Sequence, residues 1–140
     1  MNGSQRFVCV VDDSLPFLDS FSRLLQWKGY RVVTYTGAER ALEEIQQGEV
    51  DVVVADLMSP ELAGLELVRS MREAGCEIPV VLMSTRVDSD VVELAKEFGV
   101  EEFVKKPFRP MEIFDVLNRA MRNGGKKRFC STQTELKMLS

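Results

Sequence analysis

The segment that restricts the fold of this chain most is residues 50–56, whose sequence is VDVVVAD. Its four valines and one alanine form an apolar run that is too short for a helix and rich in β-branched side chains. Such a run is typical of a strand buried on both faces of a parallel sheet. It ends on Asp56, so this carboxylate is predicted to lie at the edge where open α/β sheets bind ligands. In the alternative interpretation, Asp56 only ends the strand and begins a turn containing Pro60 and Gly64.

Apolar runs and helical patterns alternate along the rest of the chain. Strands are predicted to begin near residues 7, 31, 51, 78 and 102, a spacing of 20 to 27 residues that suits one strand plus one helix. Amphipathic helices are predicted between Ser14 and Gly29, over 38–47, over 64–74, between Asp88 and Gly99, and over 110–122. Five such units predict an α/β fold with three layers, a doubly wound, five-stranded parallel sheet with five helices on its two faces.

The length and charge of the chain limit its functions. A length of 140 residues suits one domain with a single sizeable core. The net charge of −4 provides no positive surface, so direct nucleic acid binding by this segment is not expected. No apolar run reaches the roughly 18 residues of a membrane span, and residues 1–5 lack signal-peptide features, which predicts a cytoplasmic protein without a membrane partner. We expect residues 1–5 to be disordered, residues 6–122 to form the domain, and residues 123–140 to be a linker or flexible tail.

The cysteine and histidine content excludes several kinds of catalytic and metal site. Cys9, Cys76 and Cys130 are far apart in the sequence, and the chain contains no histidine. This pattern excludes a disulfide framework and the usual zinc sites. The missing histidine also excludes Ser-His-Asp and Cys-His catalysis within this chain. Any chemistry must therefore use carboxylates, hydroxyl groups, lysine and a hard metal ion.

Polar residues stand at the carboxyl ends of four predicted strands: Asp12 and Asp13, then Asp56, Ser84 and Lys106. In the flavodoxin-like strand order 2-1-3-4-5 the first and third strands are neighbours, so the three carboxylates converge. Two carboxylates about 5 Å apart repel each other by on the order of 3 kcal/mol at an effective dielectric constant of about 20. A divalent cation with oxygen ligands relieves this repulsion, and Mg²⁺ suits a site with few carboxylates and a phosphoryl oxygen.

These residues, in this order and each at the end of its strand, resemble the receiver domain of bacterial two-component response regulators. The resemblance extends over residues 6–122 and includes residues 56–64 (DLMSPELAG), 79–85 (PVVLMST) and 103–108 (FVKKPF). An isolated Asp-Asp or Lys-Pro pair has no predictive value. All of these residues and segments together, in this order and each at the end of its strand, are a specific signature of that family.

The resemblance implies a role for each carboxylate. Asp56 would be the nucleophile that accepts a phosphoryl group from a histidine kinase. Asp13 and Asp56 would bind Mg²⁺ directly, together with the backbone carbonyl of Met58, while Asp12 would act mainly through a metal-bound water. Lys106 would pair with a phosphoryl oxygen. The domain would be a regulatory phosphoacceptor rather than an enzyme, promoting only its own phosphorylation and dephosphorylation.

The resemblance also implies a switch and a set of partners. Ser84 would donate its hydroxyl to a phosphoryl oxygen, and Phe103 would then turn inward and remodel the face of the fourth helix, fifth strand and fifth helix. The bond between Lys106 and Pro107 is a candidate cis peptide. The partners would be a sensor histidine kinase or phosphotransfer protein and a downstream output domain or target protein. Homodimers on phosphorylation are common in that family.

Three other interpretations fit the sequence less well. A haloacid-dehalogenase-like Mg²⁺-dependent phosphatase would need a second aspartate two residues after Asp12, where Ser14 stands. A flavodoxin-like FMN protein needs a first loop that binds phosphate, whereas Asp12 and Asp13 would repel an anion. A degenerate receiver that acts only as an interaction module is disfavoured because every position of the acidic cluster is filled.

Overall fold

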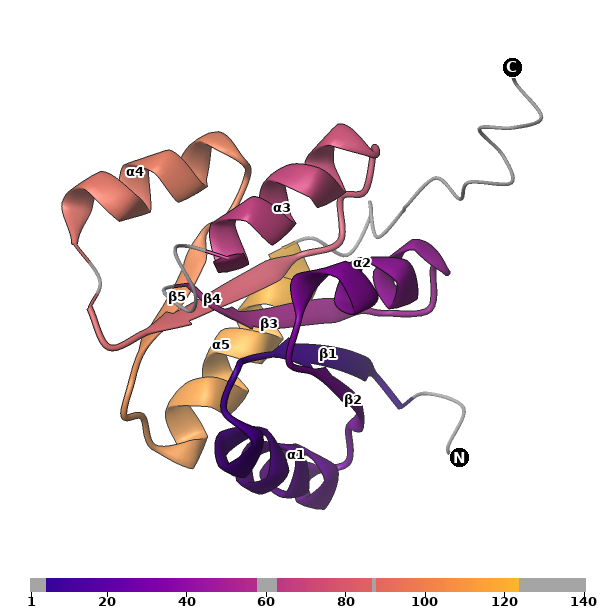
Figure 1. Ribbon diagram of the computed structural model, residues 1–140. Helices are drawn as coiled ribbons and strands as arrows, with labels where there is room; N and C mark the ends of the chain where they lie inside the picture. Colours follow the sequence, from indigo (N-terminus) through magenta and orange to yellow (C-terminus); the bar gives the residue numbers. More distant parts are fainter. Residues whose placement is uncertain (1–4, 58–62, 87, 124–140) are drawn as a thin grey trace.

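Five parallel strands form one sheet, and helices cover both of its faces (Figure 1). The computed structural model describes residues 5–57, 63–86 and 88–123. The strands are β1 (Phe7–Val11), β2 (Arg31–Tyr35), β3 (Val52–Asp56), β4 (Val80–Ser84) and β5 (Glu102–Lys105). The helices are α1 (Leu15–Lys28), α2 (Ala38–Gln46), α3 (Ala63–Glu73), α4 (Ser89–Glu97) and α5 (Pro110–Asn123). The sheet order is β2-β1-β3-β4-β5, which confirms the predicted fold and topology.

Alternate side chains of the strands enter two hydrophobic cores, one on each face of the sheet. Cys9, Val53 and Leu82 belong to the core under α2, α3 and α4. Val10 and Val54 belong to the core under α1 and α5, on the opposite side of the sheet in Figure 1. Both faces of the central strands are therefore apolar, which explains why their sequences are continuous apolar runs rather than alternating ones.

The helix ends match the predicted capping residues. Ser14 caps α1, and its hydroxyl oxygen accepts the Phe17 N–H at 3.2 Å. Asp88 caps α4 by accepting the Val91 N–H at 3.1 Å. Gly29 ends α1 with a φ of 113°, a left-handed conformation that favours glycine. No helix within the described residues is long and apolar enough to cross a membrane.

Two strands begin later than their apolar runs predict. The run at residue 50 becomes β3 only at Val52, because the Asp51 side chain takes part in the pairing instead: its carboxylate accepts the Phe7 N–H at 2.7 Å. The run at residue 78 becomes β4 only after Pro79, which has no N–H to donate to the sheet. The Pro79 carbonyl still accepts the Val53 N–H at 3.0 Å, so pairing with β3 starts there.

Helix α4 contacts the core through fewer residues than its sequence pattern predicts. Helical spacing in the sequence predicts an apolar face of Val91, Leu94, Ala95 and Phe98, and this prediction is wrong for Leu94, which is 41% exposed. Ala95 is fully buried, and Val91 and Phe98 are partly buried against the core. The helix thus contacts the core through one fully buried small residue and two partly buried ones, and Leu94 is not among them.

Candidate functional site

Three carboxylates meet at the carboxyl edge of the sheet. Asp12 and Asp13 directly follow β1, Asp56 is the last residue of β3, and these two strands pair side by side. One carboxylate oxygen of each residue lies within 4.8 Å of the others. Asp12 is 2% exposed, Asp13 is exposed and Asp56 is half-buried. The predicted convergence of the three side chains is confirmed.

Asp12 is fixed by hydrogen bonds to both of its carboxylate oxygens. Oδ1 accepts the Ser14 backbone N–H at 2.9 Å, and Oδ2 accepts a hydrogen bond from Lys106 Nζ at 2.6 Å. The Asp12 N–H donates to the Tyr35 carbonyl at 3.1 Å, which ties the turn after β1 to the end of β2. Because both oxygens of Asp12 already have protein donors, Asp12 is less suited than the exposed Asp13 to direct contact with a cation.

The Lys106 ammonium group lies close to two of the carboxylates. Its Nζ is 2.6 Å from Asp12 Oδ2 and 3.7 Å from Asp56 Oδ2. The Lys106 side chain is only 18% exposed, so solvent ions screen these interactions weakly. Its backbone N–H donates to the Ser84 carbonyl at 2.8 Å, and the bond to Pro107 is cis, as predicted. One cation among three carboxylates leaves two net negative charges at this edge.

Ser84 and Phe103 lie on β4 and β5, and their contacts are with their own turn and with the core. Ser84 ends β4 and is 1% exposed, and its hydroxyl donates to the Arg86 carbonyl at 2.6 Å. The same hydroxyl oxygen accepts the Arg86 N–H at 3.0 Å, so it closes its own turn. Phe103, in β5, is partly buried against the core under α2, α3 and α4. The single hydroxyl hydrogen of Ser84 is therefore engaged by the Arg86 carbonyl.

The chemistry of the donor atoms fits Mg²⁺. Carboxylate oxygens are the hard ligands that this ion prefers, and it typically uses one or two of them and keeps several waters. Three such groups with oxygens within 4.8 Å of one another offer that choice. Met58, whose backbone carbonyl was predicted as a further ligand, lies outside the described residues.

The contacts that two residues make at this site were not predicted from the sequence. The ring centroid of Phe17 lies 4.2 Å from Lys106 Nζ. A Cβ atom added to Gly64 would lie 2.5 Å from the carbonyl oxygen of Asp56, so the first turn of α3 approaches the end of β3 very closely. Gly64 had a usable signal, because a glycine inside a helical pattern often marks close backbone approach. Phe17 had only a weak signal, its position three residues after the Ser14 cap.

Cys9 provides no alternative nucleophile. Its thiol is fully buried in β1, and this burial, with a smaller contribution from the charge of Glu44, raises its pKa to about 12. The reactive form of cysteine is the thiolate, which is scarce at neutral pH when the pKa is this high. Cys9 is therefore a small core residue.

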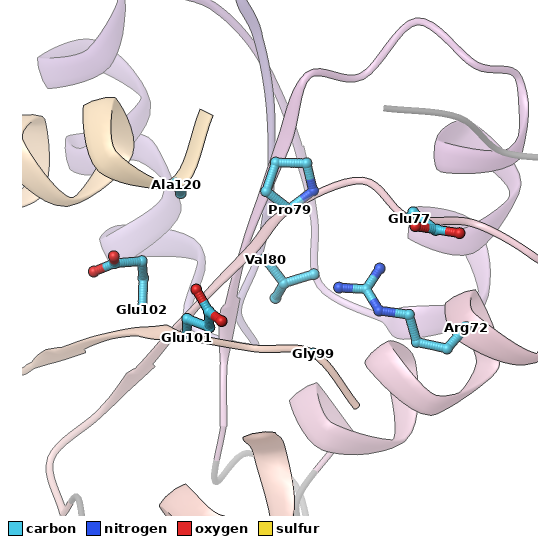
Figure 2. Close-up of a pocket in the computed structure, with 8 residues that line it drawn as sticks. All are labelled: Arg72, Glu77, Pro79, Val80, Gly99, Glu101, Glu102 and Ala120. Atoms are coloured by element: carbon cyan, nitrogen blue, oxygen red, sulfur yellow. The ribbon is translucent and has the colours of Figure 1, made fainter. Parts of the chain in front are cut away.

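A surface pocket lies at the amino ends of the strands, opposite the carboxylate cluster, and its arginine holds neighbouring loops together. It lies where β4 and β5 begin, far along these strands from Asp56, and Figure 2 shows the Arg72 side chain reaching into it from α3. The Arg72 guanidinium donates to the carbonyls of Phe98 at 2.8 Å, Cys76 at 2.9 Å and Ile78 at 3.0 Å. These bonds join the loops before β4 and β5. The pocket is lined by Arg72, Glu77, Pro79, Val80, Gly99, Glu101, Glu102 and Ala120.

Comparison with known proteins places this geometry in a family. The family model of the response regulator receiver domain matches residues 8–118. The two-component response regulator ORR3 of rice (Oryza sativa subsp. indica) is 36% identical over 117 residues, which cover 81% of this chain and 89% of that protein. The response regulator SaeR of Staphylococcus epidermidis is 28% identical, and its aligned region covers 74% of this chain but only 45% of that protein.

Solved structures agree with these sequence matches. The chemotaxis protein CheY4 of Vibrio cholerae superposes with a TM-score of 0.78 at 28% identity, covering 84% of this chain and 99% of that chain. The carboxylate cluster between β1 and β3, the lysine after β5 and the family match over most of the chain lead to the same assignment. The chain belongs to the receiver domain family of two-component response regulators.

Proposed function

We propose that Asp56 is the residue that accepts a phosphoryl group, and that a histidine kinase or phosphotransfer protein supplies it. The observation that carries this proposal is the position of Lys106 Nζ, 3.7 Å from Asp56 Oδ2 and 2.6 Å from Asp12 Oδ2. A cation held there faces the oxygens of a group attached to Asp56. Asp56 is also the half-buried member of the cluster, and it ends a central strand that pairs with β4 up to this residue.

The transfer that we propose is a displacement at phosphorus. A carboxylate oxygen of Asp56 attacks the phosphorus of a phosphohistidine, a P–O bond forms, and the P–N bond breaks. The histidine nitrogen keeps the electron pair of that bond and takes up a proton from solvent. Lys106 neutralises charge on the phosphoryl oxygens, and catalysis consists mainly of positioning and charge stabilisation.

Asp13 and Asp56 are the residues that we assign to direct Mg²⁺ binding, with the Met58 carbonyl as a further ligand. Asp12 has both oxygens engaged by Ser14 and Lys106, which supports a role at one remove from the ion. When bound, the ion would offset carboxylate charge and polarise the phosphoryl group.

The switch that we propose begins with Ser84. Its hydroxyl would leave the Arg86 carbonyl, which it now contacts at 2.6 Å, and donate to a phosphoryl oxygen instead. Phe103 would then move further into the core and change the surface formed by α4, β5 and α5. Ala95 is the buried residue of α4, and a helix with so few buried contacts is consistent with a shift that costs little free energy. Phosphorylation would thus bias an existing equilibrium between two packings.

Receiver domains are regulatory, and we propose that this one controls an output domain or a separate target protein. We assign residues 6–122 to the receiver domain and residues 123–140 to a linker or tail. SaeR, in which the aligned region is less than half of the protein, illustrates a response regulator with additional sequence beyond its receiver. Homodimer formation on phosphorylation remains part of this proposal.

Incubation with Mg²⁺ and acetyl phosphate tests the proposed acceptor. We expect the protein to gain one phosphoryl group by mass spectrometry, because acetyl phosphate transfers its phosphoryl group to a positioned carboxylate without a kinase. Reduction with borohydride, which cleaves acyl phosphates, should mark Asp56 alone in a peptide map. Continuous release of many phosphates per protein, or a mark on a different residue, would contradict the proposal.

Magnesium is expected to raise the melting temperature by relieving repulsion among the three carboxylates. At ten times its dissociation constant the ion stabilises the fold by about 1.4 kcal/mol, which corresponds to roughly 4–7 °C for a domain of this size. The measurement is a thermal melt followed by circular dichroism with and without millimolar MgCl₂. Asp13→Asn should lose most of the shift, whereas the exposed Asp115→Asn on α5 should keep it. A parent protein without any shift would contradict the metal site.

A further inference from the structure

The Lys106 ammonium has an aromatic neighbour in addition to its two carboxylates. The Phe17 ring centroid is 4.2 Å from Nζ, well inside the roughly 6 Å within which a ring face attracts a cation. Phe17 lies on α1 and Lys106 follows β5, so the two residues come from opposite ends of the domain. The contact is formed by the tertiary fold and not by local sequence.

The Phe17 ring is itself held in place from several sides. It stacks on Phe21 with centroids 5.1 Å apart, and its edge meets Phe108 at 6.3 Å. Phe21 is 3% exposed and also meets Phe108 at 5.5 Å. The Phe17 N–H is bound by the Ser14 hydroxyl, which fixes the first turn of α1. The ring is therefore a preorganised surface, and Phe108 ties it to the turn that carries Lys106.

We propose that Phe17 is a positioning residue for Lys106, whose ring face keeps the ammonium group directed at the oxygens of Asp12 and Asp56. This inference rests on the proposed role of Lys106 in neutralising the phosphoryl group. Lysine has a flexible stem with four methylene groups, so an unsupported ammonium would sample many orientations. A ring face restrains it without accepting a conventional hydrogen bond, which leaves the N–H donors for Asp12 and the phosphoryl oxygens.

An aromatic ring also suits the charge of this site better than another acid would. A fourth carboxylate near Lys106 would hold the ammonium more strongly, but it would add a negative charge where a phosphoryl group has to approach. The cluster already has two net negative charges, counting three carboxylates and one ammonium. The ring quadrupole attracts the cation and carries no net charge, so it restrains Lys106 without repelling the substrate.

Substitutions at position 17 separate this role from simple packing. Phe17→Leu keeps an apolar side chain and removes the ring, and we expect the rate of labelling by acetyl phosphate to fall about fivefold, as for a lost interaction of about 1 kcal/mol. Phe17→Tyr keeps the ring face and should label at nearly the parent rate. Replacing Phe17 with 3,4,5-trifluorophenylalanine keeps the shape but weakens the quadrupole, and should give a rate close to that of Phe17→Leu.

The matched control is Phe114, which forms the same kind of contact with a different lysine. Lys28 Nζ lies 5.2 Å from its ring centroid, and Phe114 is 4% exposed in the core under α1 and α5. Trifluorophenylalanine in place of Phe114 should leave the labelling rate at the parent value. An equal loss of rate from both fluorinated proteins would assign the effect to packing and would overturn the inference.

A second measurement does not depend on phosphorylation. Without Mg²⁺ or phosphodonor, the ¹H–¹⁵N signal of the Lys106 ammonium should be resolved in the parent and in Phe17→Tyr. It should broaden through solvent exchange in Phe17→Leu and in the trifluorinated protein. If the parent is not labelled by acetyl phosphate, the proposed function fails. The Lys106 ammonium signal still tests, in that case, whether Phe17 restrains Lys106. If the parent is labelled and all position 17 variants keep its rate and its sharp signal, the inference is wrong.

Discussion

The Asp56→Asn variant is expected to take up no phosphoryl group from acetyl phosphate or from a kinase, whereas the parent protein takes up one. The amide lacks the anionic oxygen that we propose attacks phosphorus, and it removes one of the charges that we assign to Mg²⁺ binding. The neighbouring acids do not replace it. Asp12 has both oxygens engaged at 2.9 and 2.6 Å, and Asp13 is exposed in the turn before α1. Mass spectrometry of the intact protein after incubation measures the loss.

The same variant is expected to be more stable than the parent in the absence of Mg²⁺. A measured gain in stability would also show that the variant is folded, so that its loss of labelling does not result from unfolding. Asp56 lies within 4.8 Å of two other carboxylates and 3.7 Å from the Lys106 ammonium. Two repulsions outweigh one attraction at these distances, so removing the charge should gain on the order of 2 kcal/mol. Asp115→Asn, on the exposed face of α5, should match the parent in both labelling and stability. Labelling of Asp56→Asn at the parent rate would exclude Asp56 as the acceptor.

The architecture could be predicted from the sequence because its determinants are local. Continuous apolar runs require strands buried on both faces, and residues such as Ser14 and Gly29 fix the helix ends by capping and by left-handed geometry. Three carboxylates placed at strand ends must then meet once β1 and β3 are neighbours. Topology alone turns positions that are far apart in the sequence into one cluster.

The rest of the site depends on packing that the sequence does not encode position by position. The meeting of Phe17 with Lys106 requires α1 and the turn after β5 to converge, and helical periodicity describes only the face of α1 itself. The hydroxyl of Ser84 has a choice of partners, and its bond to the Arg86 carbonyl depends on a rotamer. Leu94 is exposed although it fits the apolar pattern of α4, because the helix meets the core through Ala95, Val91 and Phe98 instead.

The close approach of α3 to β3 leads to the second large effect, which we expect for Gly64→Ala. A Cβ at this position would lie 2.5 Å from the Asp56 carbonyl oxygen and 3.0 Å from both the Asp56 carbonyl carbon and the Leu57 Cα. These are backbone atoms at the end of a central strand, and the Leu57 N–H is bound to the Met83 carbonyl at 2.7 Å. The strand therefore cannot yield without disturbing β4.

We expect Gly64→Ala to be destabilised by about 2 kcal/mol, since a clash of up to about 3 kcal/mol exceeds the helix propensity of roughly 1 kcal/mol that alanine gains. Displacing Asp56 should also slow labelling by on the order of tenfold to a hundredfold. Thermal melts and acetyl phosphate labelling measure the two effects. Gly37→Ala is the control: within the described residues, no atom other than those of position 37 and its two chain neighbours lies within 4 Å of its added Cβ, so labelling should stay at the parent rate. Parent stability and rate in Gly64→Ala would mean that α3 moves freely from β3 and that Asp56 is not held by this contact.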